Sequence, residues 1–295
     1  MTDESRNGFK TDGAPARSGT IGILYSDESG KGLTHPFFSL ILNAVKNEAQ
    51  AHGYEIMFIN EPDEKEPVDL AEHCRSRGVD GVCMVCVDFE APGIKALASD
   101  GLPCVTVDHM FRRVPAVLSD NETGVQKLVE YAIGKGHRRI AFIHGQNNSI
   151  VTRTRIAQFN NTLAYHGISV PDDYVREGKY HDIALTRTLV GEFLRRPDRP
   201  SCILLPDDLT YLGAQEAVVE MGLKIPDDIS FAGYDGIPLT QALTTKLTTI
   251  QQSSESIGKE AARRLIDLIE HPESASRMPF IFPVELLEGG TVAAL

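Results

Sequence analysis

Polar and ionisable side chains follow several apolar runs of this sequence, in each case at the point where the run ends. These residues are Ser26 and Asp27, Asp108 and His109, Asp207 and Asp208, and Asp235. Carboxylate and hydroxyl groups so placed can exchange hydrogen bonds with the polar groups of a small ligand. Any one of them could instead be a solvated loop carboxylate or a helix N-cap. Their recurrence at equivalent positions favours a shared ligand site.

The elements that must position these side chains alternate between strand and helix. Short apolar runs rich in valine and isoleucine predict strands at residues 20–24, 55–59, 81–87, 103–107, 140–144, 202–205 and 229–233. Helical periodicity predicts helices at residues 37–52, 69–77, 94–99, 122–134, 155–166, 184–195, 209–221 and 255–270. Such alternation predicts an α/β fold with parallel sheets that helices cover on both faces. Ligand groups in these sheets lie at the carboxyl ends of strands, where the polar residues named above fall.

Length and charge limit the classes of protein to which the chain can belong. Its 295 residues and 32.3 kDa suit two lobes. Acidic residues outnumber basic ones, 41 to 29, which argues against nucleic-acid binding through a broad basic face. No apolar run approaches the ~20 residues that span a bilayer, and residues 1–18 lack the apolar core of a secretory signal. We therefore expect a cytoplasmic protein without a membrane partner, with a disordered polar tail over residues 1–19.

The five cysteines show no disulfide or metal pattern. Cys83 and Cys86 have the spacing of a CxxC motif, but they fall within a predicted strand. Residues three apart on a strand point to opposite faces, so the two thiols would not face one metal ion. We expect the cysteines to be small buried apolar residues, and we expect no metal site.

A series of short motifs gives the chain a family resemblance. They are TIGI at residues 20–23, PFF at 36–38, VDGV at 79–82, DNETG at 120–124, GHRRIAFI at 136–143, IPDDIS at 225–230, GYD at 233–235 and LTTI at 247–250. In this order and spacing, over residues 20–287, the chain resembles the ligand-sensing core of the lactose-repressor (LacI/GalR) transcription factors. That core shares its fold with the type I periplasmic sugar-binding proteins.

The resemblance implies two Rossmann-like lobes between which the chain crosses three times. The crossings should lie near residues 117–119, 250–252 and 282–284. The N-terminal lobe would then comprise residues 20–118 and 252–282, and the C-terminal lobe residues 119–251 and 283–295. A small ligand would bind in the cleft between them.

The resemblance also implies ligand-binding roles for particular residues, namely Ser26, Phe37, Phe38, Asp108, Arg155, Tyr180, Asp207, Asp235 and Gln252. Phe37 or Phe38 would stack on a ring-shaped ligand, with Tyr180 opposite, although both phenylalanines could instead be ordinary core residues. Arg155 would donate to ligand oxygens, and Asp235 would accept hydrogen bonds from neighbouring hydroxyls.

Two departures from the family pattern concern the ligand. Asp207-Asp208 stands where the family usually has Asn-Asp, and the loop at residues 27–35 is longer than usual and could cap the cleft. Asp108, Asp207 and Asp235 set against Arg155 would give a net acidic cleft. A strongly anionic effector would be repelled there, so we expect a neutral sugar, with a nucleoside or an amine as less favoured choices.

The resemblance implies partners and leaves one alternative function. A family repressor begins with a helix-turn-helix headpiece, which this sequence lacks, so operator DNA would bind only through a headpiece outside this chain. We expect a homodimer and no cofactor. The solute-binding protein of a sugar ABC importer has the same fold but requires an export signal. Asp108 beside His109 suggests acid-base chemistry, yet no nucleophile elbow, Walker loop or zinc spacing accompanies them, so we expect no enzyme activity.

Overall fold

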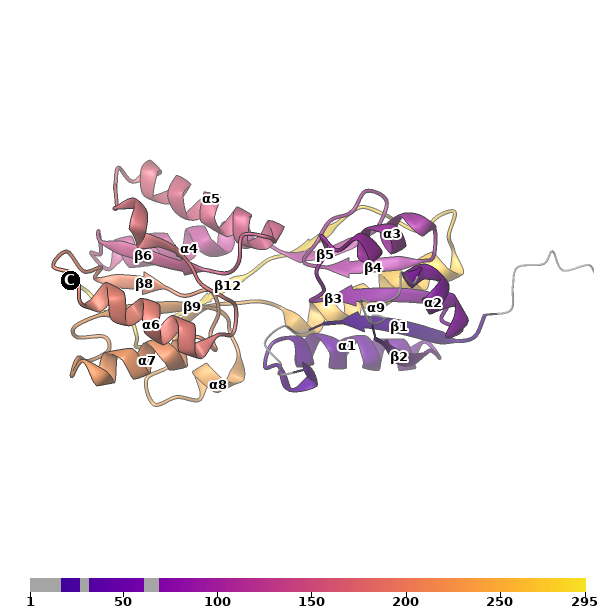
Figure 1. The fold of residues 1–295 in the computed structure, drawn as a ribbon, viewed down its shortest axis with the longest axis horizontal. Helices are drawn as coiled ribbons and strands as arrows, with labels where there is room; N and C mark the ends of the chain where they lie inside the picture. The colour runs from indigo at the N-terminus through magenta and orange to yellow at the C-terminus, as the bar shows by residue number, and fades with distance from the viewer. Residues whose placement is uncertain (1–16, 27–31, 61–68) are drawn as a thin grey trace, which may run out of the picture.

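The computed structural model describes residues 17–26, 32–60 and 69–295, which form two α/β lobes lying end to end (Figure 1). Residues 1–16 of the expected disordered tail lie outside the described residues, as do residues 27–31 of the long loop. Ser18 and Gly19, in contrast, donate their backbone N–H groups to the Asp80 carboxylate over 2.9 and 2.8 Å. The chain is thus fixed to the first lobe from residue 18 onward.

The first lobe is a parallel sheet of six strands between two pairs of helices. The strand order is β11 (Phe280–Phe282), β5 (Ala116–Ser119), β4 (Cys104–Val107), β3 (Gly81–Val85), β1 (Thr20–Tyr25) and β2 (Glu55–Ile59). One face packs against α1 (Phe38–Ala51) and α9 (Ser254–Glu270), and the other against α2 (Leu70–Ser76) and α3 (Pro92–Asp100). Helices α1 and α9 pack so closely that a Cβ on Gly258 would overlap the carbonyl oxygen of Ile41.

The second lobe repeats this plan with one antiparallel strand at its edge. Its order is β12 (Glu285–Leu287), β10 (Thr248–Gln251), β9 (Ser230–Asp235), β8 (Cys202–Leu204), β6 (Ile140–His144) and β7 (Val175–Glu177), with β12 antiparallel to β10. One face packs against α4 (Asn121–Gly134) and α5 (Ile150–Tyr165), and the other against α6 (Ile183–Leu194) and α7 (Tyr211–Glu220). The short helix α8 (Pro238–Gln241) follows β9.

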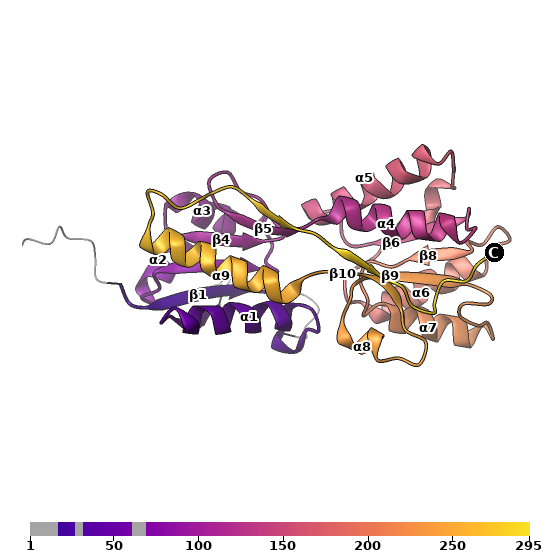
Figure 2. The same cartoon turned by 180° about the vertical axis from the view of Figure 1, so that it is seen from behind.

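The chain crosses between the lobes three times, as the family resemblance implied (Figure 2). The first crossing, at Asp120, joins β5 to α4; the second, at residues 252–253, joins β10 to α9; the third, at residues 283–284, joins β11 to β12. The first and third run side by side, because the backbone N–H of Asp120 donates to the carbonyl of Phe282 over 2.9 Å. The three crossings thus lie together at the junction between the lobes.

An apolar contact also joins the lobes beside the hinge. Leu209 and Ile237 of the second lobe are 7% and 2% exposed, and they belong to the same apolar cluster as Phe37 and Ile41 of the first lobe. Because a continuous apolar cluster excludes water from both surfaces, this interlobe contact stabilises the observed arrangement of the two lobes.

Helix α5 begins five residues before its expected start, at Ile150. The Ser149 hydroxyl accepts the backbone N–H of Thr152 over 3.0 Å and so caps the helix. Arg155 therefore lies within the helix and not at its start. In the described part of the chain, no helix is both long enough and apolar enough to cross a membrane.

The cysteines differ in burial. Cys74, Cys83, Cys104 and Cys202 are buried as expected, and burial raises the pKa of the Cys83 thiol to about 12. Cys86 is different, because it follows β3 in a left-handed conformation with φ 54° and is only partly buried. Its position at the end of the strand places it on the wall of the cavity described next.

Candidate functional site

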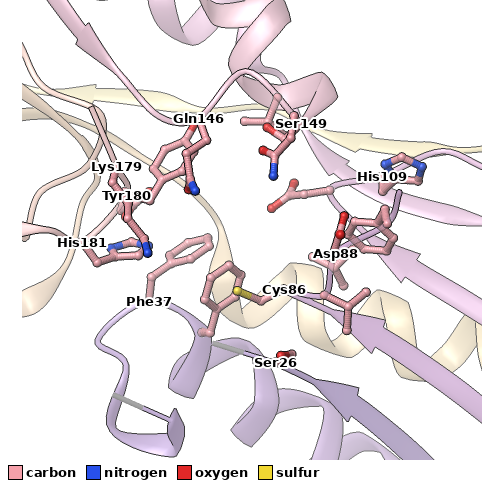
Figure 3. A pocket seen from close by; sticks show the side chains of 18 of the residues that line it. Ser26, Phe37, Cys86, Asp88, His109, Gln146, Ser149, Lys179, Tyr180 and His181 are labelled. Atoms are coloured by element: carbon pink, nitrogen blue, oxygen red, sulfur yellow. The ribbon is translucent and has the colours of Figure 1, made fainter. Parts of the chain in front are cut away.

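A cavity of about 260 Å³ lies between the lobes, at the carboxyl ends of the strands of both sheets (Figure 3). All of the predicted ligand residues line it except Asp207. Those from the first lobe are Ser26, Phe37, Phe38 and Asp108, and those from the second lobe and the hinge are Arg155, Tyr180, Asp235 and Gln252. Residues that are far apart in the sequence thus line one cavity.

Aromatic rings of both lobes form part of the cavity wall. Phe37 and Phe38 lie at the start of α1 with ring centroids 5.2 Å apart. The buried His35 holds them there, because its Nδ1 accepts the backbone N–H groups of Phe37 and Phe38 over 3.2 and 3.1 Å. The Tyr180 hydroxyl hydrogen-bonds with Thr152 Oγ1 over 2.9 Å. These hydrogen bonds hold the backbone at Phe37 and Phe38 and the hydroxyl of Tyr180 in place without a ligand.

Arg155 contributes a buried cation with a fixed orientation. Its Nε donates to Asn121 Oδ1 over 2.7 Å, and its Nη1 donates to the carbonyl of Pro206 over 3.1 Å. The guanidinium lies 3.5 Å from the centroid of the Tyr234 ring. Burial opposes its charge, but Tyr180, Tyr234 and nearby carboxylates raise the pKa of Arg155 above its ordinary value, so the group remains protonated.

Asp235 and Gln252 lie beside the hinge and are joined by a hydrogen bond. Gln252 Nε2 donates to Asp235 Oδ1 over 2.7 Å, and both side chains are buried. Burial, together with repulsion from Asp207 and Asp208, raises the pKa of Asp235 well above its ordinary value. Gln252 Oε1 is also buried, and it has no hydrogen-bond partner within residues 17–26, 32–60 and 69–295.

Asp108 also has a carboxylate oxygen that can accept a further hydrogen bond. Its Oδ1 is buried and has no hydrogen-bond partner among the described residues. Burial raises the pKa of Asp108 to about 6, although Arg155 opposes this. Asp108 and Asp235 also have positive φ values, 60° and 119°. Such strained backbone conformations, together with unsatisfied buried acceptors, are typical of ligand-binding positions.

Asp207 lies behind the cavity wall and is 1% exposed. Its Oδ2 accepts the backbone N–H of His181 over 2.8 Å, and its Oδ1 accepts that of Thr210 over 3.0 Å. Burial raises the pKa of Asp207, but His181 and the N–H donors outweigh it and hold the pKa below its ordinary value. An asparagine has one acceptor oxygen in place of two, so the carboxylate suits this role of holding the loop.

The structure adds lining residues beyond the predicted ligand set, of which His109 had already been noted in the sequence as a polar residue at a strand end. Asp88 and Phe89 follow β3, His109 follows β4, and Lys179 and His181 follow β7. They share one signal, a position just beyond the carboxyl end of a strand. Lys179 adds a positive charge to the cavity lining that the sequence analysis did not include. The lining acids are Asp88, Asp108 and Asp235, the lining cations Arg155 and Lys179, and the acidic excess is smaller than expected.

Two Rossmann-like lobes, joined by three crossings around a polar and aromatic cavity, define a two-lobed small-molecule-binding protein. Residues 18–286 match the family model described as periplasmic binding proteins and sugar binding domain of LacI family. The chain belongs to this family.

Comparisons with individual proteins give the same result. The chain is 28% identical to the ribose operon repressor of Escherichia coli K12 over 276 residues, which cover 92% of this chain and 82% of that repressor. It is 30% identical to the transcriptional repressor PurR of Erwinia tasmaniensis over 280 residues, covering 93% of this chain and 80% of PurR. A LacI-family regulator from Enterococcus faecium, solved with bound ribose, superimposes with a TM-score of 0.80 at 26% identity, covering 94% of this chain and 99% of that one.

The chain is therefore the ligand-sensing core of a LacI-family transcriptional regulator. Both of these curated relatives are named as repressors. They do not favour the alternative of an importer's solute-binding protein.

Proposed function

We propose that this regulator senses a neutral, sugar-like effector in the interlobe cavity. The observation that carries the proposal is the pair of buried acceptors, Asp108 Oδ1 and Gln252 Oε1, without hydrogen-bond partners in the described part of the chain. A buried acceptor left unsatisfied costs about 1–3 kcal/mol, which a ligand hydroxyl would recover. A polyol offers several such donors, and its ring oxygens can accept from Arg155.

The charges and the aromatic rings also support a neutral effector. The raised pKa values of Asp108 and Asp235 reflect an enclosed site that disfavours additional negative charge. Phe37, Phe38 and Tyr180 offer apolar surfaces for the C–H faces of a sugar ring. The ribose operon repressor and the ribose-bound regulator from E. faecium are relatives whose names refer to such a ligand.

Calorimetric titration tests this proposal directly. The panel comprises neutral pentoses and hexoses, uronic acids, sugar phosphates, nucleosides and amines. We expect a neutral sugar to bind, and Asp235→Asn to weaken binding because it replaces one acceptor oxygen of the carboxyl group by an amide donor. The control Asp227→Asn makes the same change at an exposed site away from the cavity and should leave binding intact. Binding of anionic sugars alone would contradict the proposal.

The assignments of lobes and partners remain parts of this proposal. The N-terminal lobe would comprise residues 20–118 and 252–282, and the C-terminal lobe residues 119–251 and 283–295. The effector would control operator binding by a headpiece outside this chain, in the cytoplasm. The core would act as a homodimer. Analytical ultracentrifugation at tens of micromolar tests the dimer, and a monomer under those conditions would contradict it.

A further inference from the structure

We propose that His35 is a proton-sensitive positioning residue, whose neutral ring is required for the contact between the lobes. Acid then weakens that contact and releases the effector. His35 precedes α1 on the first lobe, and its ring meets the ring of His181, which follows β7 on the second lobe. This inference rests on the proposed function only where it concerns the effector.

The hydrogen bonds of His35 fix the protonation of its ring. Nδ1 accepts the backbone N–H groups of Phe37 and Phe38, over 3.2 and 3.1 Å, at the start of α1. Because a backbone N–H can only donate, Nδ1 carries no proton, and the neutral ring carries its proton on Nε2. Both nitrogens of an imidazolium are donors. A second proton on His35 therefore faces two N–H donors at Nδ1 and breaks this cap of α1.

The ring of His35 is enclosed at the boundary between the lobes. It is fully buried, and it lies edge to face against the His181 ring, with centroids 4.0 Å apart and an interplanar angle of 90°. On its own lobe it packs against the Phe38 ring, with centroids 4.8 Å apart. Figure 3 shows His181 on the same side of the cavity as Phe37. Because the His35 ring is buried by both lobes, it cannot turn toward water while they remain in contact.

The charged groups around this contact favour a proton on His181 and not on His35. The buried Asp207 carboxylate lies 3.5 Å from His181 Nδ1 and accepts the backbone N–H of His181 over 2.8 Å. Other ionisable groups near His181 are Asp235 at the end of β9, and Lys179 and Tyr180 in the same loop. A proton on His181 is thus paired with a carboxylate, and its charge repels a second proton on the adjacent His35.

Protonation is therefore coupled to the arrangement of the lobes. When the lobes separate, the His35 side chain reaches water, where a histidine takes up a proton near pH 6.5. The separated form then binds one more proton than the observed form, so acid favours separation. The contact has its full stability above about pH 6.5, and below that pH its equilibrium constant falls by up to about tenfold for each pH unit.

Small-angle X-ray scattering of the chain without effector tests this inference, with His35→Asn as the main variant. Asparagine keeps an acceptor oxygen for the start of α1 but cannot take up a proton. For the native chain, the equilibrium constant of the contact should fall about tenfold between pH 7.5 and pH 5.5, which increases the radius of gyration. His35→Asn should have the same radius at both pH values. The control His271→Asn removes an exposed histidine of the first lobe and should respond as the native chain does.

His181→Gly is a second variant, which keeps the test decisive even where His35→Asn does not fold. Residue 181 has a φ of 61°, which glycine adopts without strain, and its backbone N–H can still donate to Asp207. Without the His181 ring, water reaches His35 while the lobes are in contact, and the repelling charge is lost. The increase in the radius of gyration on acidification should therefore be smaller than in the native chain.

Calorimetry with the neutral sugar that binds in the panel above tests the consequence for the effector. At pH 6, sugar binding to the native chain should release up to about 0.8 proton more per site than binding to His35→Asn, which titrations in two buffers of different ionisation enthalpy measure. Equal proton release would overturn the inference and leave the proposed function standing. An equal scattering response to acid in the native chain and in either variant would also overturn it. If no neutral sugar bound, the proposed function would fail, whereas the scattering would still decide this inference.

Discussion

The interlobe contact predicts how readily the cleft closes before an effector binds. Leu209 of the second lobe lies outside the cavity lining and packs into the cluster that contains Phe37. Leu209→Ala removes three carbon atoms, worth about 0.8 kcal/mol each when buried, or about 2.4 kcal/mol in all. If this burial depends on closure, the closing equilibrium constant falls by up to about 50-fold, since about 1.4 kcal/mol corresponds to a factor of ten.

Small-angle X-ray scattering without effector and titration with the effector measure this shift. The variant should have a larger radius of gyration than the native chain, because more molecules are open. Its effector affinity should fall in proportion to the lost closed fraction. Leu265→Ala is the matched control, because Leu265 is fully buried within the first lobe. It should lower the free energy of unfolding by about 2–5 kcal/mol and leave the scattering unchanged.

The reasoning fails if Leu209→Ala behaves like the control. Unchanged scattering and unchanged effector affinity, together with a lower free energy of unfolding, would show that Leu209 stabilises the second lobe alone. The interlobe contact would then have no part in closure.

Three further predictions concern residues behind the cavity wall. A Cβ at Gly145 would overlap the ring of Tyr180, so Gly145→Ala should weaken sugar binding at least tenfold in calorimetry. Asp207→Asn removes one acceptor from the loop at His181, whose φ is 61°, and should speed effector dissociation in stopped-flow measurements. Burial raises the pKa of Asp208 to about 7, so its protonation stabilises the folded state below about pH 4, and this contribution is lost as the pH rises through 7. In urea unfolding, the free energy of unfolding should therefore fall less between pH 5 and pH 8 for Asp208→Asn than for the native chain.

Seven of the twelve strands in the described residues were predicted from their apolar runs, together with polar residues at their ends, whereas the short strands β5, β7, β10, β11 and β12 were not. The three-residue strand β7 could not be predicted, because Val175–Glu177 contains two charged residues and no apolar run. Its position depends on pairing with β6, which is a long-range contact. For the same reason, Lys179 and His181 had no predicted strand end to mark them as cavity residues.

The directions in which neighbouring side chains point could not be predicted from the sequence either. Asp207 and Asp208 are identical neighbours after one strand, yet each turns to a different set of donors. Asp208 Oδ2 accepts the backbone N–H of Ile237 and the hydroxyl of Thr240, over 3.0 and 2.8 Å, whereas Asp207 holds His181. Only the packed loops decide which donors are near, so the family resemblance wrongly placed Asp207 on the cavity wall.

One residue takes part in both effector binding and the contact between the lobes, so a bound effector can change how the lobes are arranged. Phe37 lines the cavity and also belongs to the interlobe cluster, so a ring that stacks there favours the arrangement in which Leu209 is covered. The first lobe would move as a rigid body, because α1 and α9 are in close contact at Gly258 and the start of β1 is bonded to Asp80. That bonded start lies at the end of the first lobe away from the cavity (Figure 1). We expect rotation about the crossings to displace that distant end.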